Sequence, residues 1–512
     1  MNLRLLAAAA LALTMAQPAR ASWHKVSTKH FIIYADDDPQ ELTAFATRLE
    51  KFDRAVRLVR KMKDGDFGDG NRLTVYVVKD MDQVGKLIRN QNAAGFYRGG
   101  VSGPFAVVPK ASIGSIYQTG FSAETIFFHE YAHHLMFQVF DSPMPEWVVE
   151  GFAEMMSTAS FEKDGAVWIG RVAQHRSMGL FWGESMPLEM LLSANYGQVS
   201  EYLRESIYGR GWLLTHYLTF APERKGQLEK YLSLIGGGTA PLDAAKQAFG
   251  DLRELDRNLA TYRSQRKVSV LKVPASLFSK PEVSITPLSP GAAEIMPLRL
   301  TSKVGVSKDT AEPLAVKVRQ VAARYPGDPL VQITLAEAEL DAGHPEASEA
   351  AADRVLAANP ENVDGMIYKG RAIAKKAKAA KAVDARMMGE ARDWLLKASV
   401  ADPYDPEPLY DYYLTYGLAD EPSTPRAKAA LHRASSLVPQ DSSVRWVSAY
   451  QYLRDKDLKM ARQTMAPVAY DPHSRQAATL ARVMIERIDA GDAEGALKAG
   501  KAPEKAQSAD KD

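Results

Sequence analysis

The order of hydrophobic and polar residues predicts alternating strands and helices near the start of the chain. Short runs of β-branched and aromatic residues predict strands at residues 30–35 and 73–78. Between them, apolar residues recur at helical spacing over residues 39–62 and predict a helix. A third extended run, residues 104–109, is bounded by prolines, and proline at a strand end favours the edge of a sheet. These elements predict a mixed α and β domain.

Helical periodicity dominates the next stretch of the chain. It extends from residue 124 to about residue 265 and is interrupted by one strand-like segment at residues 166–170. Residues 266–311 begin with a segment that is rich in valine, serine and proline and lacks a helical period. They predict an extended linker or a small β module.

A repeat with a proline at each turn follows. Paired amphipathic helices over residues 312–490 alternate with turns whose prolines are 34, 43, 36 and 33 residues apart: Pro326, Pro360, Pro403, Pro439 and Pro472. A period near 34 residues with alanine at helical spacing resembles the tetratricopeptide repeat. The resemblance implies an all-α solenoid whose concave surface binds a partner protein. A generic α-helical bundle is the alternative.

The two ends of the chain differ in composition from the rest. Residues 1–21 combine Arg4, an apolar run and the small-x-small sequence Ala19-Arg20-Ala21, which is the pattern of a secretory signal peptide. The apolar run is shorter than the roughly 20 residues that span a bilayer. We therefore expect cleavage and a periplasmic or secreted protein with no membrane span. Residues 491–512 are polar and of low complexity, which predicts a disordered tail.

Composition and charge exclude several classes of function. The 512-residue chain contains no cysteine, which excludes a thiol nucleophile, a disulfide, a thiolate metal ligand and a lipid-anchored cysteine. Of its 64 basic residues, Arg4 and Arg20 belong to the predicted signal peptide, so the remaining basic residues balance the 62 acidic ones. This balance, without a basic stripe, disfavours nucleic-acid binding. Any metal must be held by histidine and carboxylate side chains.

The sequence His129-Glu130-x-x-His133 carries the clearest chemistry in the chain. On a helix, two imidazoles four residues apart lie on one face, where both can bind a single Zn²⁺. Glu130 is displaced around the helix and is placed to act on water rather than to bind the metal. His134 is not assigned to the metal.

Catalytic zinc needs a third protein ligand. On spacing alone Glu146, Glu150 and Glu154 in the next helical segment are rival ligands. We favour Glu150, because Glu154 one turn later then supplies the carboxylate that orients a metal-bound imidazole.

The zinc motif and the Glu150-Gly151-Phe152-Ala153 stretch resemble the gluzincin metallopeptidases, whose M1-type zinc aminopeptidases carry an N-E-G-F-A element. The resemblance implies a zincin-like metallopeptidase domain over residues 22–265. It also implies that Glu150 completes the zinc site with His129 and His133, and that Glu154 orients a ligand imidazole.

The stretch Tyr208-Gly209-Arg210-Gly211 resembles the Y-x-K-G element of the same peptidases. The resemblance implies that the Tyr208 hydroxyl stabilises the oxyanion of the tetrahedral intermediate. A tyrosine that merely packs at a helix start is the alternative.

The chain departs from M1 enzymes in two respects. The interval between His133 and Glu150 is shorter, and residues 93–110 lack the amine-binding glutamate element of those enzymes. The overall pattern looks closer to the peptidase-MA-like group.

These observations predict an α+β zincin-like metallopeptidase domain followed by an all-α tetratricopeptide-repeat solenoid. The expected function is that of an exported zinc peptidase, more specifically an endopeptidase, with Glu130 as general base. Residues 105–108 would pair with an extended substrate, and the repeats would recruit substrate or a partner protein. The alternative is a non-catalytic interaction protein with a vestigial zinc site, although such a protein has no need of Glu130. We expect the two halves to fold separately.

Overall fold

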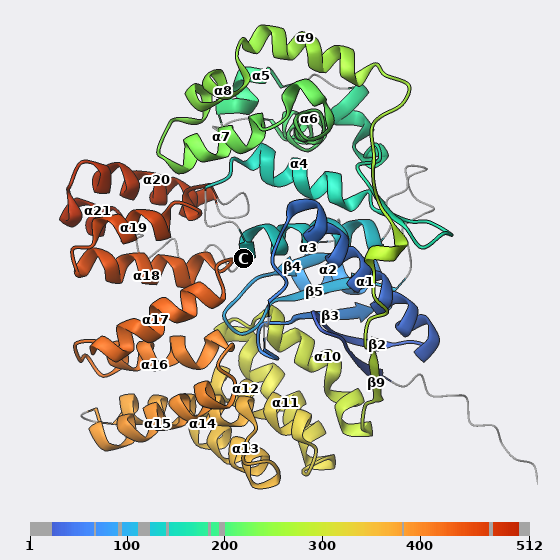
Figure 1. Ribbon diagram of the computed structural model, residues 1–512. Coiled ribbons are helices and arrows are strands. Elements are labelled where there is room, and N and C mark those ends of the chain that lie inside the picture. Colours follow the sequence, from blue (N-terminus) through green and yellow to red (C-terminus); the bar gives the residue numbers. More distant parts are fainter. Residues whose placement is uncertain are drawn as a thin grey trace, which may run out of the picture.

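The protein has an N-terminal mixed sheet followed by helices that continue to the end of the described chain (Figure 1). This computed structural model describes residues 23–65, 68–90, 95–110, 123–139, 143–182, 186–193, 200–380, 383–470 and 475–500. The predicted signal peptide and residues 501–512 lie outside the described residues. No helix in the described ranges has the length and hydropathy needed to cross a bilayer.

The main sheet has six strands in the order β4-β5-β3-β2-β1-β9. The strands are β1 (Trp23–Ser27), β2 (Phe31–Asp36), β3 (Leu73–Val78), β4 (Phe96–Arg98), β5 (Phe105–Pro109) and β9 (Ser284–Pro287). β2, β3 and β5 are parallel, whereas β1, β4 and β9 pair antiparallel with their neighbours. β2, β3 and β5 confirm the three strands predicted from the β-branched runs.

The prediction that residues 104–109 form an edge strand is wrong. β5 pairs with β3 on one side and with β4 on the other, so β4 is the strand at that end of the sheet. Pro104 precedes β5 and Pro109 is its last residue, so the backbone donors of the residues between them remain available for pairing. β4 has only three residues, too few for an alternating pattern to reveal it.

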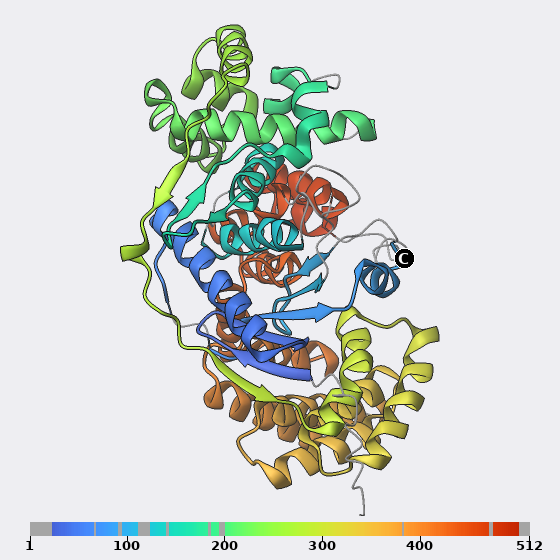
Figure 2. The same cartoon turned by 90° about the vertical axis from the view of Figure 1, so that its right-hand side faces the viewer.

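Helices cover both faces of the sheet (Figures 1 and 2). α1 and α3 lie on one face and α2 and α10 on the other: α1 (Pro39–Arg60), α2 (Met81–Ile88), α3 (Ala123–Val139) and α10 (Pro290–Val304). Successive residues of a strand point to opposite faces. Val75 of β3 therefore packs in the core with α1 and α3, whereas Tyr76 packs with α2 and α10.

A helical layer lies beyond α3 on the side away from the sheet (Figure 1). It contains α4 (Glu146–Ser157), α5 (Leu188–Ser193), α6 (Glu201–Phe220), α7 (Gln227–Gly236), α8 (Pro241–Phe249) and α9 (Leu252–Arg263). α4 packs between α3 and α6. A small sheet accompanies this layer and consists of β6 (Ser160–Phe161), β7 (Val167–Ile169) and β8 (Leu271–Val273).

Residues 266–311 do not form the predicted extended linker throughout. β8 joins β7 and β9 joins β1, so the first part completes both sheets of the N-terminal half. Residues 290–304 contradict the prediction, because they form the helix α10. Its Met296 and Leu300 belong to the core on the face of the sheet that α2 also covers. The internal Pro297 obscured the helical pattern, since proline removes one ladder hydrogen bond. The two halves therefore share a core.

The C-terminal region is a helical solenoid in which each helix packs on the next. Its members are α11 (Lys308–Arg324), α12 (Pro329–Asp341), α13 (Pro345–Ala358), α14 (Val363–Ala379), α15 (Ala385–Ala401), α16 (Pro406–Leu418), α17 (Pro425–Leu437), α18 (Ser442–Arg454), α19 (Leu458–Met465), α20 (Arg475–Asp489) and α21 (Ala493–Ala499). It curves from below the sheet to the level of α7 (Figure 1). The predicted disorder is wrong for α21, because Ala496 is buried against its neighbours.

Candidate metal centre

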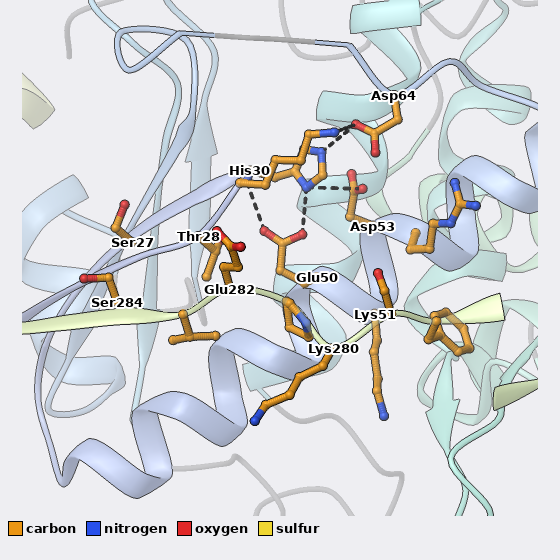
Figure 3. A pocket seen from close by; sticks show the side chains of 16 residues that line it. Ser27, Thr28, His30, Glu50, Lys51, Asp53, Asp64, Lys280, Glu282 and Ser284 are labelled. Atoms are coloured by element: carbon orange, nitrogen blue, oxygen red, sulfur yellow. Dashed lines mark hydrogen bonds and ion pairs between the residues drawn. The ribbon is translucent and has the colours of Figure 1, made fainter. Parts of the chain in front are cut away.

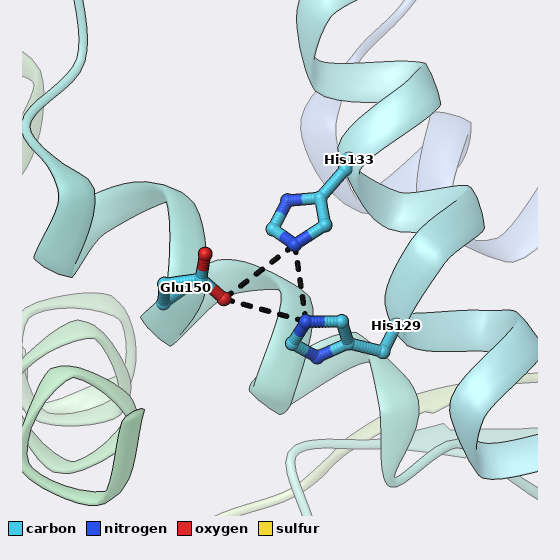
Figure 4. Close-up of side chains that lie close together, drawn as sticks. All are labelled: His129, His133 and Glu150. Carbon is cyan, nitrogen blue, oxygen red and sulfur yellow. Dashed lines mark hydrogen bonds and ion pairs between the residues drawn. The ribbon is translucent and has the colours of Figure 1, made fainter. Parts of the chain in front are cut away.

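Two histidines of α3 and one glutamate of α4 converge on one point (Figure 4). The Nε2 atoms of His129 and His133 are 3.0 Å apart. Glu150 Oε2 lies 3.3 Å from the first of these nitrogens and 3.5 Å from the second. The structure thus brings together the three side chains that the sequence proposed as metal ligands.

The donor set fits a zinc ion. Two donors that are each about 2.0–2.2 Å from a tetrahedral ion are separated by roughly 3.3–3.6 Å, close to the separations found here. Among the described residues, the buried Oε2 atom of Glu150 has no hydrogen-bond partner. A buried carboxylate oxygen without a partner is costly unless a cation or a donor satisfies it.

The charges in the cluster stabilise one another. Burial disfavours the charge of Glu150, but the imidazoles of His133 and His129 outweigh burial and hold the pKa of this carboxyl well below its usual range. Burial also opposes protonation of His129, yet the charges of Glu154 and Glu150 raise its pKa to about 9. The carboxylates and the imidazoles therefore stabilise opposite charges on one another within this buried cluster.

The carboxylate of Glu154 contacts the ring of His129 on the side away from Glu150 and His133. Its Oε1 atom is 3.3 Å from His129 Nδ1, so the carboxylate faces the ring nitrogen opposite the converging Nε2. Two side chains of a 3₁₀ turn, Gln174–Arg176, hold this fully buried carboxylate: His175 Nε2 at 2.6 Å and Arg176 Nε at 2.7 Å. Burial raises the pKa of Glu154, but Arg176 and the two histidines lower it to about 2.

Sequence reasoning missed His175 and Arg176. Their only signal was a pair of basic residues after a short strand, and no spacing rule connects a glutamate in one helix with a turn 21 residues later. Both side chains contact the cluster through Glu154.

Tyr208 of α6 lies beside the cluster. Its ring centroid is 6.3 Å from that of His129, and the Arg176 guanidinium is 4.4 Å from the ring centroid of Tyr208. The charge of Glu150 and then burial raise the pKa of Tyr208, so its hydroxyl keeps its proton at neutral pH. It is therefore a hydrogen-bond donor on a ring that lies beside that of His129.

A pair of glycines brings α6 this close to α4. A Cβ on Gly151 would overlap the carbonyl oxygen of Gly211 and lie 2.5 Å from Thr215 Oγ1. A Cβ on Gly211 would be 2.8 Å from the carbonyl oxygen of Trp147. Only glycine permits such a close crossing of the two helix backbones.

Three other residues weighed in the sequence occupy different places. Glu130 follows His129 on α3 and is half-buried. Glu146, a rival ligand on spacing, is the first residue of α4 and is not part of the three-residue cluster. His134 is buried, and its Nδ1 is 2.8 Å from the hydroxyl of Tyr97 in β4. Burial lowers the pKa of His134 to about 3, so it is neutral.

A second group of ionisable side chains surrounds His30 in a hollow of about 710 Å³ (Figure 3). His30 Nδ1 is 2.7 Å from Glu50 Oε2, and Nε2 is 3.0 Å from Asp64 Oδ1. The neighbouring Asp53 accepts from Arg57 Nε at 2.8 Å. Burial lowers the pKa of His30, but these carboxylates outweigh it and raise the pKa above 6.5. The carboxylates already have protein partners, so the group is an ion-pair network.

Comparisons with known proteins identify no family. No protein-family model matches the chain, and no curated protein matches it. One similar solved structure is that of a thermophilic tetratricopeptide-repeat protein in Thermus thermophilus, which is 18% identical, covers 35% of this chain and 90% of its own, and has a TM-score of 0.29. A TM-score this low supports no conclusion about fold or function.

Proposed function

We propose that the protein is an exported zinc-dependent endopeptidase. The observation that carries this proposal is the convergence of His129, His133 and Glu150, with the buried Glu154 behind His129. Two histidines and one carboxylate form a ligand set of catalytic zinc, which keeps a fourth position for water or substrate. The zincin-like fold and the gluzincin resemblance belong to this proposal.

The chain supplies the groups that peptide hydrolysis needs around such a site. Zinc, when bound by these three residues, polarises a carbonyl and makes water more acidic. Glu130 accepts a proton from the attacking water and returns it to the leaving amine. Tyr208 donates a hydrogen bond to the oxyanion that develops on the former carbonyl oxygen. Glu154 contacts Nδ1 of His129, so that Nε2 of this ring points to Glu150 and His133, with which it would hold zinc.

The proposed preference is for internal peptide bonds. An exopeptidase of the M1 type needs a carboxylate for the substrate amine, and the sequence between residues 93 and 110 contains no glutamate or aspartate. β4 ends the sheet next to α3, where the backbone of an extended peptide can pair with it. We therefore propose that β4 pairs with the substrate, instead of residues 105–108 as the sequence predicted.

Zinc content and peptide cleavage test the proposal together. The purified protein should hold one equivalent of zinc, and Glu130→Gln should retain it while hydrolysis falls about 10²–10⁴-fold. Glu124→Gln is the matched control, since this residue lies on the same helix and pairs with Arg48 instead. Zinc-free protein, or a zinc-loaded Glu130→Gln variant with full activity, would contradict the assignment.

The alternative function is a non-catalytic interaction protein of the periplasm. The helical solenoid favours a role in protein binding. Zinc-loaded protein that cleaves no member of a broad peptide library, yet captures a defined protein partner through its solenoid, would support this alternative. Export is tested separately by the N-terminal sequence of the mature protein, which should start near Ser22.

A further inference from the structure

β4 lies between the metal-site helix and the solenoid. Tyr97, its central residue, is hydrogen-bonded to His134 of α3. Glu130 lies one helical turn before His134 on α3, so the two residues share the helix face that Tyr97 contacts. Glu130 is the proposed base, and Asp441 belongs to the turn between α17 and α18.

The turn at Asp441 is hydrogen-bonded to the loop that follows β4. Asp441 Oδ2 accepts a 2.8 Å hydrogen bond from the backbone N–H of Val101. The other oxygen, Oδ1, caps α18 by accepting from Ser443 and Val444 at 2.8 and 3.0 Å. The Val101 side chain packs against the apolar cluster at the end of α17. One oxygen of this buried carboxylate therefore binds the loop after β4, and the other caps α18.

Gly99 closes the contact between β4 and the turn. A Cβ at this position would be 2.6 Å from the Tyr97 hydroxyl oxygen and 2.9 Å from Gln440 Cγ. Tyr97 thus contacts His134 on one side and Gly99 on the other, and Gly99 in turn lies against Gln440. The position of β4 relative to α3 depends on the solenoid turn.

The preceding repeat turn holds a second loop in the same way. Asp402 Oδ2 accepts from the backbone N–H groups of Asp69 and Gly70 at 3.1 and 3.3 Å. Asn71 of the same loop donates a 2.6 Å hydrogen bond to the carbonyl of Leu437, at the end of α17 and next to the turn Pro439–Asp441. At these turns the solenoid binds its own N-terminal half, so this part of its surface is not free for a partner.

We propose that the turn Pro439–Asp441 positions β4 for substrate binding. It fixes β4 so that an extended peptide can add to the sheet beside Glu130. The proposal rests on the proposed peptidase function. It assigns the solenoid a role in the binding of unstructured peptides through β4, in addition to any recruitment.

Asp441→Asn tests this role selectively. A carboxamide has one acceptor oxygen, so it cannot both cap α18 and accept from Val101. Asp457→Asn is the matched control, because Asp457 caps α19 with one oxygen and its side chain is exposed. Hydrogen exchange should accelerate at residues 95–103 in Asp441→Asn and remain unchanged in the control. If Asp441→Asn does not fold, Gly99→Ala should produce the same change by displacing Tyr97 or Gln440.

Peptide binding is measured in the zinc-loaded Glu130→Gln background, which separates binding from cleavage. The probe is a fluorescein-labelled fragment of unfolded casein, followed by anisotropy. Asp441→Asn should weaken its affinity about three- to tenfold, the size expected for one backbone hydrogen bond. Unchanged exchange at residues 95–103, unchanged affinity, or no peptide binding by the parent would overturn the proposal. Binding that depends on Asp441 in a protein that cleaves no peptide would support it and refute the peptidase function instead.

Discussion

The hydroxyl of Tyr131 donates a 2.7 Å hydrogen bond to Asp53 Oδ1. Tyr131 lies between His129 and His133 in the sequence of α3, and Asp53 lies in the middle of α1. The same carboxylate is paired with Arg57 and lies 3.5 Å from His30 Nδ1. The ion-pair network around His30 is thus directly connected to α3, the helix that carries His129 and His133.

The raised pKa of His30 predicts a specific dependence of stability on pH. Because its pKa is raised above 6.5 in the folded protein, its stabilising contribution is complete below the unfolded pKa and is lost as the pH rises through the folded pKa. The difference in unfolding free energy between the wild type and His30→Gln should therefore shrink as the pH rises above 6.5. Urea unfolding across this range measures it. Glu50→Gln should weaken the pH dependence, and a difference that grows with pH would contradict the assignment.

Glu154→Gln should weaken zinc binding without removing a ligand. A neutral amide cannot hold His129 as strongly, and loss of such a carboxylate typically costs 10–100-fold in metal affinity. Competition with a chromophoric chelator gives the dissociation constant. Glu205→Gln is the control, because Glu205 also contacts Arg176 but is largely exposed. Equal zinc affinity in the two variants would show that Glu154 does not position the histidine.

Gly151→Ala should destabilise the protein by about 1–3 kcal/mol, because the new methyl group forces α4 away from α6. Gly389→Ala is the contrasting change, since nothing lies within 4 Å of a Cβ at this position in α15. It should stabilise its helix by about 0.5–1 kcal/mol. Thermal unfolding of both variants tests the crossing, and an undisturbed Gly151→Ala protein would show that the helices have room to separate.

Removal of all residues after Arg266 should abolish cooperative folding. The shortened chain loses β8, β9 and α10 and exposes the core that Tyr76 and Val107 share with Met296. A chain that ends at Gly305 restores these elements and should regain protected amides in β1 and β3. Circular dichroism melts and hydrogen exchange compare the two chains. A cooperative melt of the shorter chain would restore the modular interpretation made from sequence.

The sequence alone determined the features that depend on near neighbours in the chain. The spacing of His129 and His133 places both rings on one helix face, because 3.6 residues make a turn. β-branched runs predicted β2 and β3, and regular prolines predicted the order of helices and turns in the solenoid. Each of these inferences needs only a few consecutive residues.

Only the tertiary structure decided which distant segments meet. The pairing of Glu154 with Arg176, the position of β4 outside β5 and the contact of Val101 with Asp441 depend on chain folding that local pattern does not encode. α10 escaped detection because Pro297 interrupts its pattern while its buried residues complete a core built by other elements. Burial against distant partners, rather than local propensity, stabilises these features.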